Sequence, residues 1–182
     1  MGRRADRREE TRRRIIEAAV ALHSTLGPAR TTVAQIAERA GVQRHTYYAH
    51  FPEERDLFLA CSGHALAHDP LPDVARWRAL PPGWERIRHG LEELYRWYER
   101  NAEMAACVIR DAEHHALTRE MTELRMLPTF AAAHQTLGEG MNPRAQVLLG
   151  VALDFACWRS LHATQDAGNA ALLMSDAVCA LE

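Results

Sequence analysis

The side chains with the most distinctive chemistry lie in the segment QRHTYYAH, residues 43–50. Arg44 can donate two parallel hydrogen bonds to guanine O6 and N7, and Gln43 can pair in the same way with adenine. His45 stands beside them at the same end of the segment. Hydroxyl, phenol and imidazole groups suit phosphate oxygens, whose contacts fix the register of a protein on DNA, and the segment offers Thr46, Tyr48 and His50. This composition indicates contacts with both the bases and the backbone of a DNA duplex.

Two short helices joined by a tight turn would hold this segment in place. Thr32 can cap the first helix, because a glutamine follows three residues later and apolar residues then recur at helical intervals. Gly41 accepts the positive φ of a sharp helix end, so a second helix over residues 43–50 can leave at a steep angle. Tyr47 and Phe51, four residues apart, would face inward. The candidate base readers then lie at the N-terminal end of a recognition helix, where such helices meet base edges.

An ordered series of motifs extends from residue 13 to residue 58. It comprises RRIIEAAVALHSTLG, TTVAQIAERAGV, a recognition helix containing TYYAHF, and then Pro52 and the pair Leu57-Phe58. In this series, which covers about a quarter of the chain, the protein resembles the TetR family of bacterial transcriptional regulators. The resemblance implies that phosphate is contacted by Thr32, Thr46, Tyr48 and His50. It implies that bases are read by Gln43, Arg44 and His45.

The chain departs from the family pattern at two places. The family usually has a lysine just after the Phe-Pro pair, contacting phosphate from the start of the fourth helix, whereas this chain has Glu53-Glu54-Arg55. Acidic residues there would repel a facing duplex, so Arg55 is the substitute we expect to contact phosphate. Gln43 and His45 stand where the family usually has small residues. We therefore expect this protein to recognise an operator sequence that differs from any family consensus.

Charge is distributed unevenly along the chain. Residues 1–50 hold ten arginines against five acids, a net charge of +5, whereas residues 51–182 hold twelve arginines against nineteen acids, a net charge of −7. The basic end is therefore the expected DNA-binding end. Seven of the arginines fall within residues 1–14, and they form either a flexible arm that reaches the minor groove or a solvated start to the first helix.

Several classes of protein are disfavoured by composition. No segment approaches the ~20 consecutive apolar residues of a membrane span, and the N-terminus lacks the apolar core of a signal peptide, so we expect a cytoplasmic protein. The four cysteines are far apart and lie within apolar helical segments, which is typical of reduced, packed thiols. No cofactor is expected.

Beyond about residue 65 the pattern is again helical, with expected helices over residues 84–101, 102–115, 118–137, 145–161 and 170–181. Pro128 should kink the third of these. The helix over 145–161 is apolar on nearly every side and needs cover on two faces, one of which a partner subunit could supply. We expect a homodimer through the last two helices, as the family resemblance also implies. The candidate interface residues are Leu149, Leu153, Leu172 and Leu173.

These patterns predict an all-α protein with two domains. Residues 1–52 would form a three-helix DNA-binding domain of the helix-turn-helix type, and residues 53–182 a helical domain for ligand binding and dimerisation, with 53–68 as the connecting helix. A two-fold dimer should read a roughly palindromic operator of double-stranded DNA, with half-sites about 34 Å or a multiple apart. The resemblance implies a repressor that a small molecule releases by separating the two reading helices.

The C-terminal part also predicts the chemistry of that small molecule. It is rich in flat and pliable side chains, which suit an apolar or aromatic effector but equally form ordinary helical cores. The candidate pocket residues are Trp84, Tyr95, Tyr98, Met104, Cys107, Met121, Phe130, His134, Phe155 and Trp158.

Three alternatives remain open from the sequence. A regulator that senses a transition metal could use the pair His64 and His68, four residues apart, or the pair His114 and His115, although neither has a cysteine at ligand spacing. An architectural DNA-binding protein would need no effector. An enzyme is disfavoured, because Cys107 and His114 would lie ~10 Å apart along a helix.

Overall fold

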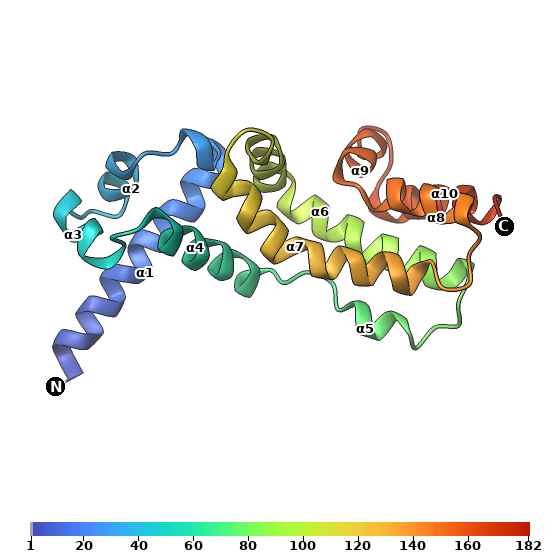
Figure 1. Cartoon of the computed structure of the whole chain (residues 1–182), viewed down its shortest axis with the longest axis horizontal. Helices are drawn as coiled ribbons and strands as arrows, with labels where there is room; N and C mark the ends of the chain where they lie inside the picture. The colour runs from blue at the N-terminus through green and yellow to red at the C-terminus, as the bar shows by residue number, and fades with distance from the viewer. Residues whose placement is uncertain (1) are drawn as a thin grey trace. The chain divides into compact units, whose positions relative to one another are not determined.

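The structure is a computed structural model that describes residues 2–182, apart from the side chain of Arg3. Its described part contains helices and no strand (Figure 1). In chain order the elements are α1 (Gly2–Thr25), η1 (Pro28–Arg30), α2 (Val33–Arg39), α3 (Arg44–His50), α4 (Glu54–His68), α5 (Val74–Trp77), α6 (Trp84–Ala112), α7 (Ala116–Leu137), α8 (Pro143–Leu153), α9 (Phe155–His162) and α10 (Ala167–Cys179). The expected all-α fold is confirmed. None of the described helices is both long and apolar enough to cross a membrane.

The chain divides into two compact units. Unit 1 comprises residues 1–70 and 103–125, and unit 2 comprises residues 71–102 and 126–182. The division differs from the expected boundary at residue 52, because α4 packs against α1 and because the end of α6 and the start of α7 also belong to unit 1. The long helices α6 and α7 thus each contribute to both units.

Unit 1 is built on the apolar face of α1. Ile15 and Ala19 are fully buried there, and α2, α3 and α4 supply the other side of the core through Ile36, Tyr47 and Leu57. Figure 1 shows α2 and α3 together at one end of this unit, with α4 alongside α1. Residues 2–14 form the first half of α1, so the arginine-rich segment is the start of a helix rather than an irregular arm.

A buried carboxylate joins the end of α6 to the loop after α1, within unit 1. The side chain of Asp111 is almost fully buried; it accepts hydrogen bonds from the Ala29 N–H (2.9 Å) and from Arg110 Nε (2.8 Å). Arg110 also donates to the carbonyl of Leu26 (2.9 Å). The loop passes so close that a Cβ at Gly27, whose φ is +94°, would lie 2.3 Å from Asp111 Oδ2. Only glycine fits there.

In unit 2, the single helix expected over residues 145–161 is two helices, α8 and α9. The chain breaks at Asp154, an extended residue whose carboxylate accepts from the Ala156 N–H (2.6 Å) and so caps α9. The break exposes carbonyls at the end of α8, and two buried phenols take them: Tyr95 donates to the Ala152 carbonyl (2.7 Å) and Tyr98 to the Leu153 carbonyl (2.8 Å). Burial raises the pKa of both tyrosines, so they remain donors.

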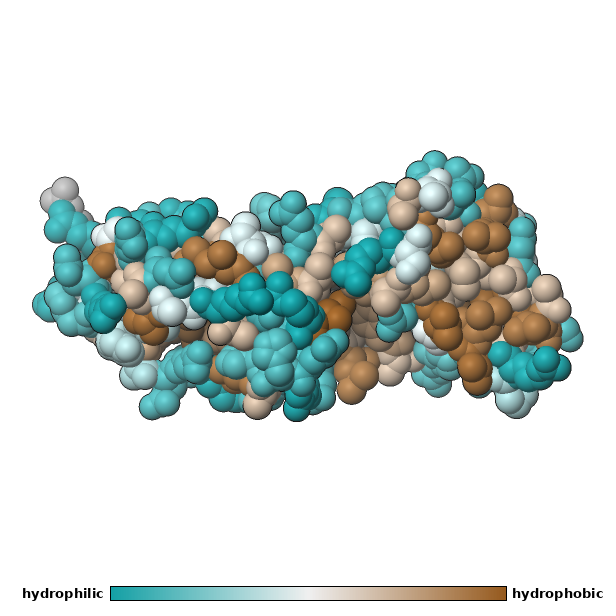
Figure 2. All heavy atoms as spheres, turned by 90° about the horizontal axis from the view of Figure 1, so that it is seen from above, coloured by the Kyte–Doolittle hydropathy of each residue, from teal (hydrophilic) through white to brown (hydrophobic). Residues whose placement is uncertain are grey.

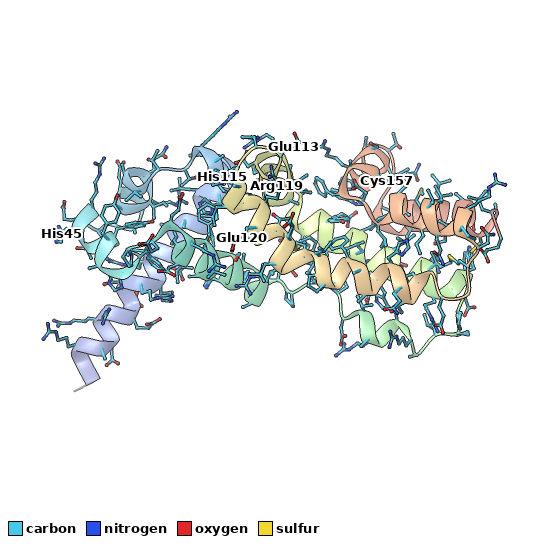
Figure 3. The ribbon with its side chains drawn as sticks, viewed as in Figure 1. His45, Glu113, His115, Arg119, Glu120 and Cys157 are labelled. Carbon is cyan, nitrogen blue, oxygen red and sulfur yellow. The ribbon has the colours of Figure 1, made fainter. Side chains whose placement is uncertain are left out.

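One other expectation about helices is changed. The expected helices over 84–101 and 102–115 are one continuous helix, α6, which ends at Ala112. Pro128 lies inside α7, which continues to Leu137. At the turn between α6 and α7, Arg119 donates to the carbonyls of Ala112 (2.9 Å) and Glu113 (2.7 Å) and so satisfies the end of α6 (Figure 3).

Candidate nucleic-acid interface

The helix-turn-helix is fixed by short-range hydrogen bonds that its sequence supplies. Thr32 forms the capping box expected for it, since its N–H donates to Gln35 Oε1 (2.8 Å) and its Oγ1 accepts from the Gln35 N–H (3.3 Å). Gly41 has a φ of +64°, and the following Val42 N–H donates to the Ala37 carbonyl (2.9 Å). The chain thereby turns out of α2 within three residues and enters α3.

Adjacent residues of α3 have opposite environments. Tyr47 is 2% exposed and packs against Phe51, with ring centroids 6.1 Å apart, whereas Tyr48 is 52% exposed. The two phenol rings meet edge to face at 5.3 Å. Burial, with smaller contributions from neighbouring charges, raises the pKa of Tyr47 to about 12. Tyr47 therefore anchors α3 in the core of unit 1, and Tyr48 is left on the surface.

The predicted base-reading residues are all exposed at the start of α3. Gln43 occupies the N-cap position without a side-chain cap hydrogen bond, and Arg44 and His45 follow in the first turn. Figure 3 shows His45 projecting from this helix. The His45 ring lies within hydrogen-bonding distance of the Thr46 hydroxyl (3.3 Å between Nε2 and Oγ1). The structure thus places three polar side chains together at the helix end that the sequence predicts to face base edges.

The predicted phosphate-contacting residues are placed less uniformly. Tyr48 and Thr32 are exposed, although the Thr32 hydroxyl is already used in the capping box. Thr46 and His50 are half-buried. Burial and the nearby guanidinium groups of Arg8 and Arg12 lower the pKa of His50.

Arg55, the predicted substitute for the family's lysine, forms an ion pair within unit 1. Its Nε and Nη2 atoms donate to one carboxylate oxygen of Glu120 on α7, at 2.8 and 2.7 Å. Both side chains are about half exposed, so this ion pair contributes little to stability. It does, however, neutralise the guanidinium that was predicted to replace the family's lysine.

The ten candidate pocket residues are divided between the two units. Met104, Cys107 and Met121 belong to unit 1, and the Cys107 thiol donates to the Thr25 carbonyl (3.7 Å). Trp84 is 37% exposed and donates to Asp176 (2.7 Å), and the His134 ring lies 3.0 Å from the Gln146 carbonyl. The other five are ring residues that contact one another in unit 2: Tyr95, Tyr98, Phe130, Phe155 and Trp158.

The candidate dimer residues separate into two pairs, which corrects half of that prediction. Leu149 and Leu153 are buried within unit 2, on the inward face of α8, and are not available to a partner. Leu172 and Leu173 on α10 are 39% and 51% exposed. The sequence prediction did not include Val147 and Val151, which are 72% and 50% exposed. Their spacing of four residues on one face of α8 was the available signal.

The exposed apolar side chains of α8 and α10 form a hydrophobic surface on unit 2. Figure 2 shows hydrophobic side chains gathered over α8 and α10. We call the four exposed side chains Val147, Val151, Leu172 and Leu173 the apolar face.

The histidine and cysteine residues do not form a site for a metal. Within residues 2–182, no group of three or more histidine, cysteine or acidic side chains has a geometry that could hold an ion. His64 and His68 are exposed on α4, and the His115 ring is engaged with the Thr118 hydroxyl (2.7 Å). The four cysteines form no disulfide.

Comparison with known proteins points to one family. Residues 15–61 match the model described as bacterial regulatory proteins, tetR family. Over 82 residues, 43% of this chain, the sequence is 38% identical to the HTH-type transcriptional regulator SrpR of Pseudomonas putida. Over the same share it is 37% identical to the uncharacterized HTH-type transcriptional regulator TtgW of Pseudomonas putida. These matches span 37% of SrpR and 58% of TtgW, so the chain matches less than two thirds of either relative.

Two further similarities extend this comparison. The HTH-type transcriptional regulator TtgR of Pseudomonas putida is 50% identical over 52 residues, which are 29% of this chain and 25% of TtgR. A crystal structure of RolR in complex with the ligand resorcinol aligns with a TM-score of 0.47 and 19% identity, covering 95% of this chain and 89% of RolR. The family model covers the segment that carries the capping box, the turn and the recognition helix. Residues 15–61 therefore carry a domain of the tetR family of bacterial regulatory proteins.

Proposed function

We propose that this protein is a sequence-specific transcriptional regulator that binds a palindromic operator as a dimer, represses transcription, and is released by a small molecule. The observation that supports DNA reading most directly is the contrast within α3. Tyr47 is buried, while Gln43, Arg44 and His45 are exposed together at the N-terminal end. A helix held this way presents polar side chains to base edges without unfolding.

Selection from random duplexes tests this function. The purified protein should enrich a palindrome, and the complex should have the mass of a dimer or a pair of dimers. We expect the Arg44→Ala variant to enrich the same palindrome with relaxed preference at one base position per half-site, a loss of about 1–3 kcal/mol of discrimination. Arg39→Ala, an exposed arginine at the end of α2, is the control and should keep the wild-type preference. Absence of any enriched sequence would instead indicate an architectural DNA-binding protein.

We propose that the apolar face is the dimer interface. Exposed leucine and valine side chains are costly in water. In a two-fold dimer the apolar face of one subunit would be buried against that of the other, which stabilises the dimer by about 25 cal/mol per Å² of apolar surface buried. The interface so proposed keeps Leu172 and Leu173 from the sequence prediction and replaces Leu149 and Leu153 by Val147 and Val151.

A charge on this face should separate the subunits. We expect Leu173→Glu to shift the protein to the mass of a monomer in analytical ultracentrifugation and to weaken operator binding. Leu127→Glu is a matched control, because Leu127 is 62% exposed on α7, outside the apolar face. If both variants dissociate equally, or if neither dissociates, the apolar face is not the dimer interface.

The contacting aromatic residues of unit 2 (Tyr95, Tyr98, Phe130, Phe155 and Trp158) favour a flat effector that carries a hydrogen-bond acceptor. Trp158 is 1% exposed, and its indole N–H has no partner among the described residues. It lies among Tyr98, Phe155 and His162, with ring centroids 4.8–5.5 Å away. A buried donor without a partner is costly, and an acceptor on an aromatic ligand would satisfy it. To test for such an effector, small aromatic compounds are added to the complex of the protein with its selected duplex, and release of the DNA is measured. If compounds that bind the protein do not release the DNA, the protein is a regulator that aromatic effectors do not release.

A further inference from the structure

Two arginines of α1 lie beside the end of the recognition helix. Arg8 and Arg12 are four residues apart and therefore share one face of α1. The Arg12 guanidinium carbon stands 5.1 Å from the centroid of the Phe51 ring. Arg12 also lines a groove of about 430 Å³ together with His50, Phe51, Asp56, Leu59 and Ala60.

The stacking on Phe51 gives Arg12 a defined position. A guanidinium held over an aromatic face keeps its N–H groups free at the edge, in a fixed fork that suits phosphate geometry. Because Phe51 is 1% exposed and belongs to the core of unit 1, this position is tied to the frame that carries α3.

Two other arginines of unit 1 are paired with carboxylates, whereas Arg8 and Arg12 are not. Arg13, on another face of α1, pairs with Glu10 (2.8 Å) and Glu17 (2.7 Å). Arg55 pairs with Glu120 (2.7 Å). Neither Arg8 nor Arg12 has a carboxylate partner in the part of the chain that the structure describes. Two guanidinium groups without an ion-pair partner therefore lie where α1 meets the end of α3.

We propose that Arg8, Arg12 and His50 form a binding subsite for a DNA backbone phosphate beside the recognition helix. This inference rests on the proposed DNA-binding function and deepens it. The subsite takes the role of the phosphate contact that the start of α4 loses, since Glu53 and Glu54 are acidic there and Arg55 is neutralised.

The charges around His50 determine how the subsite responds to pH. Arg8, Arg12 and Glu9 face it from α1, and Asp56 lines the groove from α4. Without DNA, burial and the two arginines lower the pKa of His50, while Glu9 opposes them. A bound phosphate favours the imidazolium, so DNA binding takes up a proton at this site. Affinity should therefore rise as pH falls through the titration of His50.

The test compares charge variants on a mixed-sequence DNA duplex, because a phosphate contact does not depend on sequence. Binding is followed by fluorescence anisotropy from about 50 to 200 mM salt. Each lost phosphate contact should lower the slope of log K against log salt by about 0.9, which is roughly an eightfold weaker complex at about 100 mM salt. We expect this loss for Arg12→Gln and a larger one for the Arg8→Gln, Arg12→Gln double variant.

Two control variants separate phosphate binding from packing. Arg13→Gln removes a charge from the same helix on its neutralised face and should keep the wild-type slope. Arg12→Lys keeps the charge and should keep most of the slope, and thermal unfolding by circular dichroism checks that each variant folds. A slope unchanged in the double variant, or equal losses for Arg12→Lys and Arg12→Gln, would overturn the subsite. Failure of the wild-type protein to bind any duplex would overturn the DNA-binding function itself.

Discussion

Replacing Tyr47 by alanine is expected to destabilise unit 1 by about 3–5 kcal/mol, the cost of removing a large aromatic side chain from a packed core. Tyr47 is 2% exposed and belongs to the same buried cluster as Ile15, Ile36 and Leu57. Its loss would leave a cavity at the point where α3 is held against α1 and α4. We therefore expect the Tyr47→Ala variant to lose cooperative unfolding of unit 1 and, with it, DNA binding. Urea unfolding followed by circular dichroism measures this effect.

The neighbouring tyrosine provides the matched control. Tyr48 is 52% exposed, so Tyr48→Ala should change the free energy of unfolding by no more than about 0.5 kcal/mol. Its effect should fall on DNA affinity, and similarly for all duplex sequences, because a phenol at this position is proposed to contact phosphate. Equal destabilisation by the two substitutions would mean that α3 is not anchored through Tyr47.

Acidification should destabilise unit 1 by about 3 kcal/mol between pH 7 and pH 4 through His23 alone. His23 is buried between α1 and α4, where its ring packs on Phe58 at 5.2 Å and its Nδ1 lies 3.7 Å from the Cys61 thiol. Burial lowers the pKa of His23 to about 4; His115 lowers it slightly, and Asp111 opposes the shift. Burial also raises the pKa of Cys61 to about 12, so the pair is neutral.

The sign follows from the proton balance. The unfolded chain protonates His23 near its ordinary pKa of about 6.5, whereas the folded chain does so only near 4. Between these values the unfolded state binds more protons, so stability is fully present above pH 6.5 and is lost as pH falls toward 4. Unfolding by urea at a series of pH values should show this slope in the wild-type protein and a smaller one in His23→Leu. His64→Leu, at an exposed histidine of α4, should keep the wild-type slope; an identical slope in His23→Leu would contradict the assignment.

Asp111 links the same buried region to the loop after α1. Burial opposes its ionisation, but hydrogen bonds from Arg110 and the Ala29 N–H outweigh this, so the pKa of Asp111 lies below its usual value. The Asp111 carboxylate is also near enough to the neutral His23 ring to affect the pKa of that ring.

The sequence by itself determined the local structure of the helix-turn-helix. The capping box of Thr32, the positive φ of Gly41 and the burial of Tyr47 beside an exposed Tyr48 were all predicted, and the structure has each of them. These features depend on residues within about four positions of one another, where backbone geometry and helical periodicity fix the outcome. The all-helical fold was predictable for the same reason.

Only the tertiary structure decided which side chains remain available. Arg55 is neutralised by Glu120, and Arg12 stacks on Phe51, although the partners in each case are distant in sequence. Within the apolar segment over 145–161 only Asp154 marks the break, which the phenols of α6 stabilise by taking the carbonyls at the end of α8. The break and the packing of α8 then bury Leu149 and expose Val151. Contacts between segments far apart in the chain set these outcomes, and periodicity alone cannot identify which of several apolar faces the fold will cover.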